Sequence, residues 1–357
     1  MRLRTMTTAH RDAVERGSAL GTTFAAQFER TAALYLGHFA ELGIPDDDVR
    51  GIAERSHAAL RQWTPAQADE SDAIADAARV ERWRLGAVGA RTEILAAAPP
   101  RREGECSTAV RVGPGVVAET FQTWDWHDFL VPEGLLMAYQ SSAGLEVKLF
   151  TEFGTAAKIG VNSAGIGLHF NILSHRTDSV AGGVPVHAIA RRILEEARTL
   201  DDAERIARSA AVSASTVFTV IQQDGDGSSA ASIEVSPAGV AVVPPDGDGW
   251  LLHTNHFLDP ALAEGDTMPP ESTTLERLGH LAAVRDELEG LEPARRALAA
   301  CGGQGEQAAI CMTPDAGLHP IDQWATLLTI SLDAVGIALD FFPGRPDQAA
   351  TAGLDRF

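Results

Sequence analysis

Lysine is almost missing from this chain, because only Lys148 and Lys158 contribute to its 29 basic residues and arginine supplies the rest. Asp and Glu number 49, so the formal net charge is −20. A surface of that sign repels the phosphates of nucleic acids and of anionic lipids. We therefore expect neither a nucleic acid nor a membrane as a partner.

Cysteine is scarce too, and Cys106, Cys301 and Cys311 include no CxxC pair. That spacing argues against a zinc site and against a disulfide framework. No stretch approaches the 18 uninterrupted apolar residues typical of a membrane span, and the first residues lack the apolar core of a signal peptide. These absences predict a cytoplasmic protein.

The composition is that of a globular protein, and its predicted helices and strands come in groups along the chain. Apolar residues spaced three and four apart predict helices within 17–98, which end at Pro99-Pro100, and again within 183–212, 272–291 and 293–301. Short alternating runs predict antiparallel strands within 107–126, 134–153 and 156–173, a meander over 215–257 with DGDG and SPAG turns, and a closing hairpin over 325–342. Grouped strands favour an α+β fold of layered sheets over a doubly wound one, with the change at 99–106 as a boundary inside one fold.

Cys106 stands at that boundary, in "PPRREGECSTAV" (99–110). A free cysteine at the start of a strand is most often buried and inert. It becomes a nucleophile if a base removes its proton, and the neighbouring sequence offers no histidine for this. If the Glu105–Cys106 bond were cut, the new α-amine of Cys106, with a pKa of about 7.7–8.0, would be a suitable base.

Two other patterns have simpler interpretations. His253 and His256 spell HxxH, but no nearby helical carboxylate pattern accompanies them, so a metal pair is disfavoured. The two DGDG runs lack the ligand spacing of an EF-hand and are interpreted as hairpin turns rather than calcium loops.

Eight stretches in order resemble the acyl-coenzyme A:6-aminopenicillanic acid acyltransferase family, also called the C45 peptidases, which are N-terminal-nucleophile hydrolases. They are RGSALG (16–21), ARTEIL (90–95), CSTA (106–109), QTWDW (122–126), TEFGTAAKIGVNSAGIG (151–167), GVPVHAIARRIL (183–194), LLHTNHF (251–257) and STTLER (272–277). The resemblance covers about nine-tenths of the chain. It implies a four-layer αββα sandwich, two antiparallel sheets face to face with helices outside.

The resemblance also implies an enzyme precursor, or zymogen, that cleaves itself before the nucleophile. The bacterial source is predicted separately, because the Ala- and Arg-rich, Lys-poor composition is typical of a GC-rich bacterial genome. The small chain would be 1–105 and the large chain 106–357, which stay associated as one domain. Cys106 would attack an amide or thioester and pass the acyl group to water or an amine, as in natural-product metabolism. Coenzyme A would enter only as a leaving group of an acyl-coenzyme A substrate, and no metal or other cofactor is needed; a homo-oligomer is compatible with all of this.

The resemblance assigns roles to further residues. Asn255 matches the side-chain amide of the oxyanion hole, and Asp125 matches an Asp that assists self-cleavage and orientation. Substrate binding or structural support is implied for Thr108, Trp124, Asn162, His256 and Arg277. Lys158 also matches a family position, where a structural salt bridge is the simpler interpretation.

Two departures and two alternatives accompany this prediction. The family has Gly before the nucleophile where this chain has Glu105, and often Asn where it has Thr123; Gly permits the strained backbone that favours self-cleavage. One alternative is a catalytically silent, unprocessed binding or scaffold protein. The other is a conventional cysteine hydrolase that uses a distant base such as His253 or His256.

Overall fold

The computed structural model describes residues 1–98, 105–225, 227–269 and 271–357. Most of the predicted boundary at 99–106 therefore lies outside the described residues. No helix within these ranges is both long enough and apolar enough to cross a membrane.

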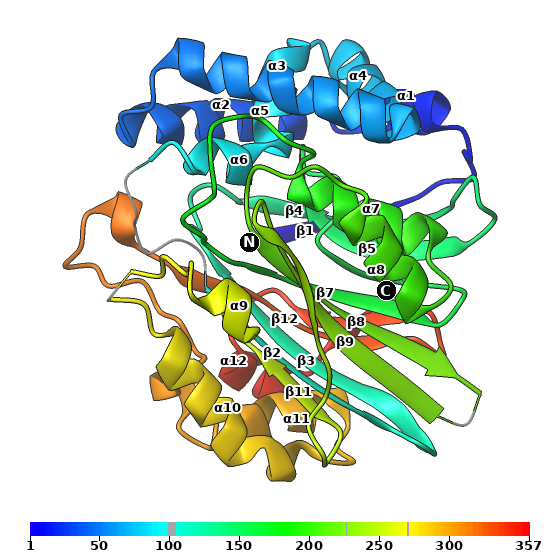
Figure 1. Cartoon of the computed structure of the whole chain (residues 1–357), viewed down its shortest axis with the longest axis vertical. Coiled ribbons are helices and arrows are strands. Elements are labelled where there is room, and N and C mark those ends of the chain that lie inside the picture. The colour runs from blue at the N-terminus through cyan, green and yellow to red at the C-terminus, as the bar shows by residue number, and fades with distance from the viewer. Residues whose placement is uncertain (99–104, 226, 270) are drawn as a thin grey trace.

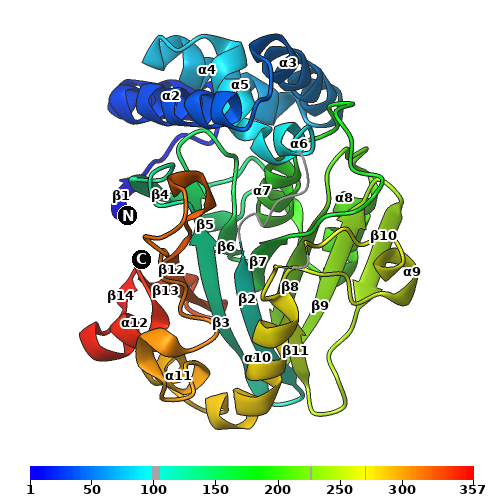
Figure 2. The same ribbon diagram turned by 90° about the vertical axis from the view of Figure 1, so that its left-hand side faces the viewer.

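Two sheets lie at the centre of the molecule (Figures 1 and 2). The first has the order β1-β4-β5-β6-β7-β8-β9-β10, with bounds β1 (Arg2–Thr7), β4 (Glu133–Gln140), β5 (Glu146–Glu152), β6 (Ile159–Asn162), β7 (Ile166–Ile172), β8 (Thr216–Asp224), β9 (Gly227–Ser236) and β10 (Gly239–Val243). The second has the order β11-β2-β3-β12-β13-β14, with bounds β2 (Cys106–Gly113), β3 (Val116–Trp126), β11 (Trp250–His253), β12 (Ala325–Asp333), β13 (Ala338–Phe342) and β14 (Asp355–Arg356). β2 and β3 contact β9, so the sheets pack face to face.

Helices cover the outer faces of both sheets. α7 (Val186–Glu196) and α8 (Leu200–Arg208) lie against strands β6 to β10, while α10 (Thr274–Leu288), α11 (Pro293–Ala300) and α12 (Pro346–Ala352) lie against the six-stranded sheet. Within the described ranges this is the expected αββα order, so the α+β fold class is confirmed. The one-turn helix α9 (Pro260–Ala263) follows β11 in the chain.

A separate helical layer lies at one end of the molecule, in blue and cyan in Figure 1. It comprises α1 (Ala13–Thr23), α2 (Ala25–Glu41), α3 (Asp46–Trp63), α4 (Pro65–Ala78), α5 (Arg82–Gly89) and α6 (Arg91–Leu95). The RGSALG stretch has a packing role here, because a Cβ on Gly17 would lie 2.5 Å from the Glu70 carbonyl oxygen and one on Gly21 would lie 2.4 Å from that of Ile74. Glycine at both positions lets α1 approach the backbone of α4 closely.

Two features of the sheets differ from the sequence-based description. β1 is an unforeseen strand, and it pairs with β4 in parallel, whereas the other pairings are antiparallel. The predicted meander over 215–257 is wrong in its last step, since β8, β9 and β10 pair in succession but β11 crosses to the other sheet and pairs with β2, His253 opposite Thr108. That crossover brings the segment after β11 beside Cys106.

Candidate active site

Cys106 is the first residue of β2, and its side chain is buried. In the β2–β3 ladder it is paired with Trp124. Paired residues of neighbouring strands point to the same face of a sheet, with Cβ atoms about 5 Å apart. The sheet therefore fixes the thiol beside the Trp124 ring.

The peptide bond between Glu105 and Cys106 is hydrogen-bonded at both of its polar atoms. The backbone N–H of Asp125 donates to the Glu105 carbonyl oxygen at 2.8 Å. The Cys106 N–H donates to Oδ1 of Asn255, also at 2.8 Å. The first contact continues the β2–β3 ladder, so a regular sheet places a donor on the carbonyl that self-cleavage would attack.

Asn255 lies just after β11, and its partners fix the orientation of its amide. Oδ1 accepts from Nη2 of Arg277 at 2.9 Å, and an arginine offers only donors. Nδ2 donates to the carbonyl oxygen of Ile172 at 2.9 Å. In the uncut chain Asn255 thus accepts from the Cys106 N–H through Oδ1, while its Nδ2 is a donor.

Arg277, on the first turns of α10, is fully buried and holds this site together. Its Nη1 donates to the Cys106 carbonyl oxygen at 2.6 Å and to Oγ of Ser107 at 3.0 Å. Its Nη2 binds Asn255 and its Nε binds Oγ1 of Thr273 at 3.0 Å. The planar guanidinium thereby links the strand that begins with Cys106 to the segment that follows β11.

Glu105 stands where the family has Gly, and its side chain is held by hydrogen bonds to residues just before α10. Its carboxylate accepts from the Ser272 hydroxyl at 3.0 Å, from the Thr273 N–H at 3.0 Å and from the Thr273 hydroxyl at 2.8 Å. Arg277 Nη2 lies 3.6 Å away. An anion at the start of α10 is stabilised by the unpaired N–H groups and the dipole of that helix.

The surroundings of Cys106 keep its thiol protonated. Burial raises the pKa of Cys106 to about 12, and the charge of Asp125 adds to the rise, while the charges of Lys158 and Arg277 oppose it. Asp125, on β3 beside Trp124, is itself fully buried. The thiol therefore needs a base before it can react.

Asn171 on β7 was not singled out from the sequence, yet it belongs to the site. Its Nδ2 donates to the carbonyl oxygens of Cys106 at 3.2 Å and of His253 at 3.4 Å. Its Oδ1 accepts from the Thr108 hydroxyl at 2.8 Å and from Nε2 of Gln122 at 3.1 Å. The contact crosses from one sheet to the other, which no local sequence pattern signals.

The other predicted residues have different surroundings. Asn162 donates to the carbonyls of Leu194 and Ala197 and accepts from the N–H of Ala164 and of Ile166, so it ties the β6–β7 turn to the end of α7. His256 Nδ1 lies 2.9 Å from Oγ1 of Thr274, near Asn255 in the chain.

His253 is fully buried, and both of its ring nitrogens are engaged. Nε2 lies 2.9 Å from Oε1 of Glu234, and Nδ1 lies 3.0 Å from the Thr254 carbonyl oxygen. Both ring nitrogens thus have partners other than Cys106. Among the described residues, no group of three or more His, Cys, Asp or Glu side chains is arranged to hold a metal ion.

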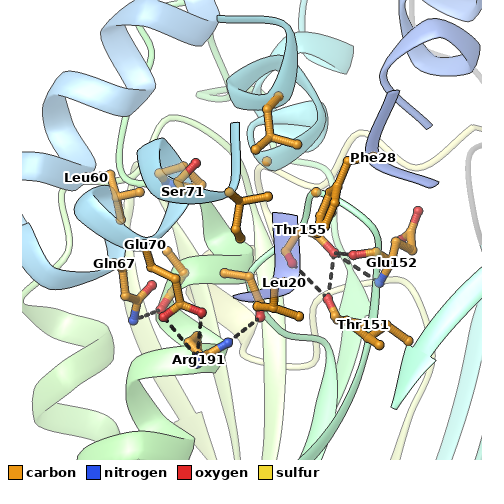
Figure 3. Close-up of a pocket in the computed structure, with 18 of the residues that line it drawn as sticks. Leu20, Phe28, Leu60, Gln67, Glu70, Ser71, Thr151, Glu152, Thr155 and Arg191 are labelled. Atoms are coloured by element: carbon orange, nitrogen blue, oxygen red, sulfur yellow. Dashed lines mark hydrogen bonds and ion pairs between the residues drawn. The ribbon is translucent and has the colours of Figure 1, made fainter. Parts of the chain in front are cut away.

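A cavity lies between the helical layer and strands β4 and β5 (Figure 3). Gln67, Glu70 and Arg191 gather at one side of it, and Thr151, Thr155 and Glu152 at the other. Cys106 is not among its lining residues. Glu152 links this cavity to the surroundings of Cys106, because its carboxylate also lies 3.2 Å from the Nζ of Lys158, whose charge acts on the Cys106 thiol.

Two facing sheets between helices, with Cys106 at the start of a central strand, define the class: a protein with the N-terminal-nucleophile hydrolase fold. Within that class the chain belongs to a family of acyltransferase enzymes, described as acyl-coenzyme A:6-aminopenicillanic acid acyl-transferase, whose model matches residues 120–303. The matched range includes Asp125, Asn255 and Arg277 and begins after Cys106. The prediction of the family is thereby confirmed.

Individual relatives are similar over most of the chain. It is 27% identical over 295 residues to the 40 kDa form of acyl-coenzyme A:6-aminopenicillanic-acid-acyltransferase from Emericella nidulans, a match that covers 81% of this chain and 78% of that protein. Two solved structures are similar at a TM-score of 0.45. One is penicillin V acylase from Agrobacterium tumefaciens (14% identity, 67% of this chain and 83% of that chain), and the other is a mutant of conjugated bile acid hydrolase from Clostridium perfringens (10% identity, 70% and 92%).

Proposed function

We propose that this protein is a self-processing cysteine amidohydrolase or acyltransferase that works through an acyl-enzyme on Cys106. The observation that carries the proposal is the Glu105–Cys106 peptide itself, whose carbonyl accepts from the Asp125 N–H while its N–H donates to Asn255. A donor on a carbonyl oxygen stabilises the negative charge that develops there during attack.

In the proposed first step, the Cys106 thiolate attacks the Glu105 carbonyl carbon. The C–N bond then breaks, and a thioester remains between the Glu105 carbonyl and the Cys106 sulfur. Water opens this thioester, which gives a small chain 1–105 and a large chain 106–357. Glu105 would then be a C-terminal residue whose side chain is still bound to Ser272 and Thr273 of the large chain, and this supports lasting association of the two chains.

In the proposed mature enzyme, the new α-amine of Cys106 is the base that takes the thiol proton, directly or through a water. Asn255 Oδ1, already bound to that nitrogen, would orient the amine. A hydrogen of Asn255 Nδ2 would meet the substrate oxyanion, and one such donor contributes about 3–4 kcal/mol to transition-state stabilisation. Asp125 and Arg277 would keep the reacting groups in position and would set the electrostatic environment of Cys106.

The substrate class proposed is a small amide or an acyl thioester such as an acyl-coenzyme A, with release of the acyl group to water or to an amine. The family assignment and the relative from Emericella nidulans support this class. Cytoplasmic location is part of the same proposal, and the free thiols of Cys106, Cys301 and Cys311 are compatible with it.

Intact-protein mass spectrometry tests the proposal. The purified wild-type chain should give two species split before Cys106, and the Cys106→Ala variant a single species near 37.8 kDa. Cys301→Ser and Cys311→Ser are matched controls that should still be cleaved. After incubation with amide and acyl-thioester donors, the large chain should gain the mass of one acyl group.

A wild-type chain that remains whole and gains no acyl group would instead support the silent scaffold protein. The histidine-dependent cysteine hydrolase makes a different prediction: His253→Ala or His256→Ala would abolish turnover of a chain that stays uncut.

A further inference from the structure

The α-amine of Cys106 cannot be the base for self-cleavage, because it forms only when the Glu105–Cys106 bond is cut. In the uncut chain this nitrogen is an amide whose N–H donates to Asn255, so it has no lone pair to accept a proton. The buried thiol nevertheless has to lose its proton before it attacks Glu105. Another base must therefore act in the precursor.

Lys158, just before β6, has a side-chain amine that lies next to Trp124. Its Nζ lies 4.5 Å from the centre of the Trp124 ring, and Trp124 is the residue paired with Cys106. The Phe170 ring lies 5.2 Å from the same Nζ. Trp124 thus has the thiol of Cys106 beside it on the sheet and the amine of Lys158 over its ring, in a site closed to solvent.

Lys158 shares its carboxylate partner, Glu152, with a second cation. Glu152 is already paired with Arg91, whose Nη2 lies 2.8 Å from Oε1, and it accepts from the Tyr35 hydroxyl at 2.5 Å. Lys158 adds a second cation at 3.2 Å from the same carboxylate. His187, stacked on Phe170, adds no charge, because burial lowers its pKa well below the usual value.

This arrangement makes the ammonium group acidic. Burial and the charge of Arg91 lower the pKa of Lys158 to about 8, against the opposing effects of Glu152 and Cys106. Loss of the proton leaves Glu152 still paired with Arg91. A neutral amine is thus accessible near neutral pH without an unpaired carboxylate.

We propose that Lys158 is the proton acceptor for Cys106 during self-cleavage, an inference that rests on the self-cleavage proposed above. Neutral Lys158 takes the thiol proton, and the Cys106 sulfur forms its bond to the Glu105 carbonyl carbon. As the C–N bond breaks, the Lys158 ammonium gives the proton to the departing Cys106 nitrogen. Water then opens the thioester, its hydroxyl going to the Glu105 carbonyl and its remaining hydrogen to the sulfur.

The rival role for Lys158 is purely structural, as a permanent cation beside Glu152. Arginine separates the two roles, because it keeps the positive charge but cannot give up its proton in a protein. Lys158→Arg should therefore preserve the ion pair and abolish proton acceptance. Lys148→Met is the matched control, since Lys148 is the other lysine of the chain and lies partly exposed on β5.

The experiment follows cleavage of freshly translated full-length chain in a cell-free system by intact mass, after transfer to buffers between pH 6 and 9.5. We expect the wild-type rate to rise until the pH passes about 8, where Lys158 loses its proton. Lys158→Arg and Lys158→Ala should cleave at least about 100-fold more slowly, and Lys148→Met at the wild-type rate. Methylamine should restore part of the rate in Lys158→Ala, and near-ultraviolet circular dichroism reports whether each variant is folded.

A folded Lys158→Arg chain that cleaves within about threefold of wild type, with the same pH profile, would overturn the role of Lys158 and leave self-cleavage intact. If Lys158→Arg does not fold, a pH-independent wild-type rate or the absence of amine rescue would overturn it. A wild-type chain that never cleaves would refute both proposals. These outcomes distinguish failure of the base from failure of the cleavage.

Discussion

The backbone N–H of Asp125 donates to the carbonyl oxygen of Glu105 at 2.8 Å, and this contact is part of the ordinary ladder between β2 and β3. A sheet hydrogen bond therefore polarises the carbonyl next to Cys106. Because the donor is a main-chain group in a rigid sheet, it requires no rearrangement as charge develops on the oxygen. The Asp of QTWDW thus contacts the Glu105–Cys106 peptide through its backbone N–H.

Asn255→Asp should separate the two roles proposed for this side chain. An aspartate keeps an oxygen for the Cys106 N–H and for Arg277, so we expect the chain to fold and to be cleaved. It lacks the Nδ2 donor, so turnover of an acyl donor should fall about 10²–10³-fold, as on loss of one oxyanion-hole donor. Cleavage is measured by intact mass and turnover by product formation; undiminished turnover in the cleaved variant would exclude the oxyanion role.

Glu105→Ala should slow self-cleavage rather than accelerate it. The carboxylate binds Ser272 and Thr273 and so fixes the residue whose carbonyl would be attacked in the proposed self-cleavage; without these contacts we expect cleavage roughly tenfold slower or more. Glu276→Ala, at an exposed position on α10, is the matched control. Faster cleavage in Glu105→Ala, measured in the same time course, would mean that Glu105 hinders processing.

Arg277→Met should lower both stability and turnover. It removes a fully buried cation that donates to Cys106, Ser107, Thr273 and Asn255, and breaking such a buried charged network costs about 3–5 kcal/mol. Arg285, on the same helix, provides the contrast: it is partly exposed and binds Asp246 and Asp248 at the surface, so Arg285→Met should cost much less than Arg277→Met. Urea unfolding measures both variants, and equal losses would contradict the central role of Arg277.

The fold class was predictable because local patterns carry it. The helices of 183–212 and 272–301 and the closing hairpin have the periodicity and turn residues that such elements require. The path of β11 was not predictable in the same way. The DGDG turn before it resembles the turn between β8 and β9, but only the packing of two sheets decides that β11 pairs with β2.

The residues of the candidate site also fall into these two groups, those with a local sequence pattern and those placed only by packing. Cys106, Asp125, Asn255 and Arg277 carry a motif-level signal, and the structure brings the backbone or side chain of each to the Glu105–Cys106 peptide. Asn171 gives no local signal, since it acts across the gap between the sheets. Their chemical roles remain predictions.

The contribution of Glu93, on α6, to the stability of this protein should fall as the pH rises through neutrality. Its Oε1 accepts from the Val186 N–H at 2.9 Å, while Oε2 is buried with no hydrogen-bond partner among the described residues. Burial raises the pKa of Glu93 from 4.5 to about 7. The folded state therefore binds this proton more tightly than the unfolded state, so its stabilising effect is complete below about pH 4.5 and is lost as the pH rises through about 7.

Glu93→Gln removes this dependence, because glutamine keeps the acceptor for Val186 and stays neutral. We expect the variant to gain on wild type from pH 5 to 8, by at most about 3 kcal/mol, since each pKa unit corresponds to about 1.4 kcal/mol. Urea unfolding at a series of pH values on the Cys106→Ala background, which keeps the chain in one piece, measures the difference. Glu276→Gln should follow the wild-type curve, and a Glu93→Gln curve parallel to wild type would show that Glu93 is already ionised in the folded protein.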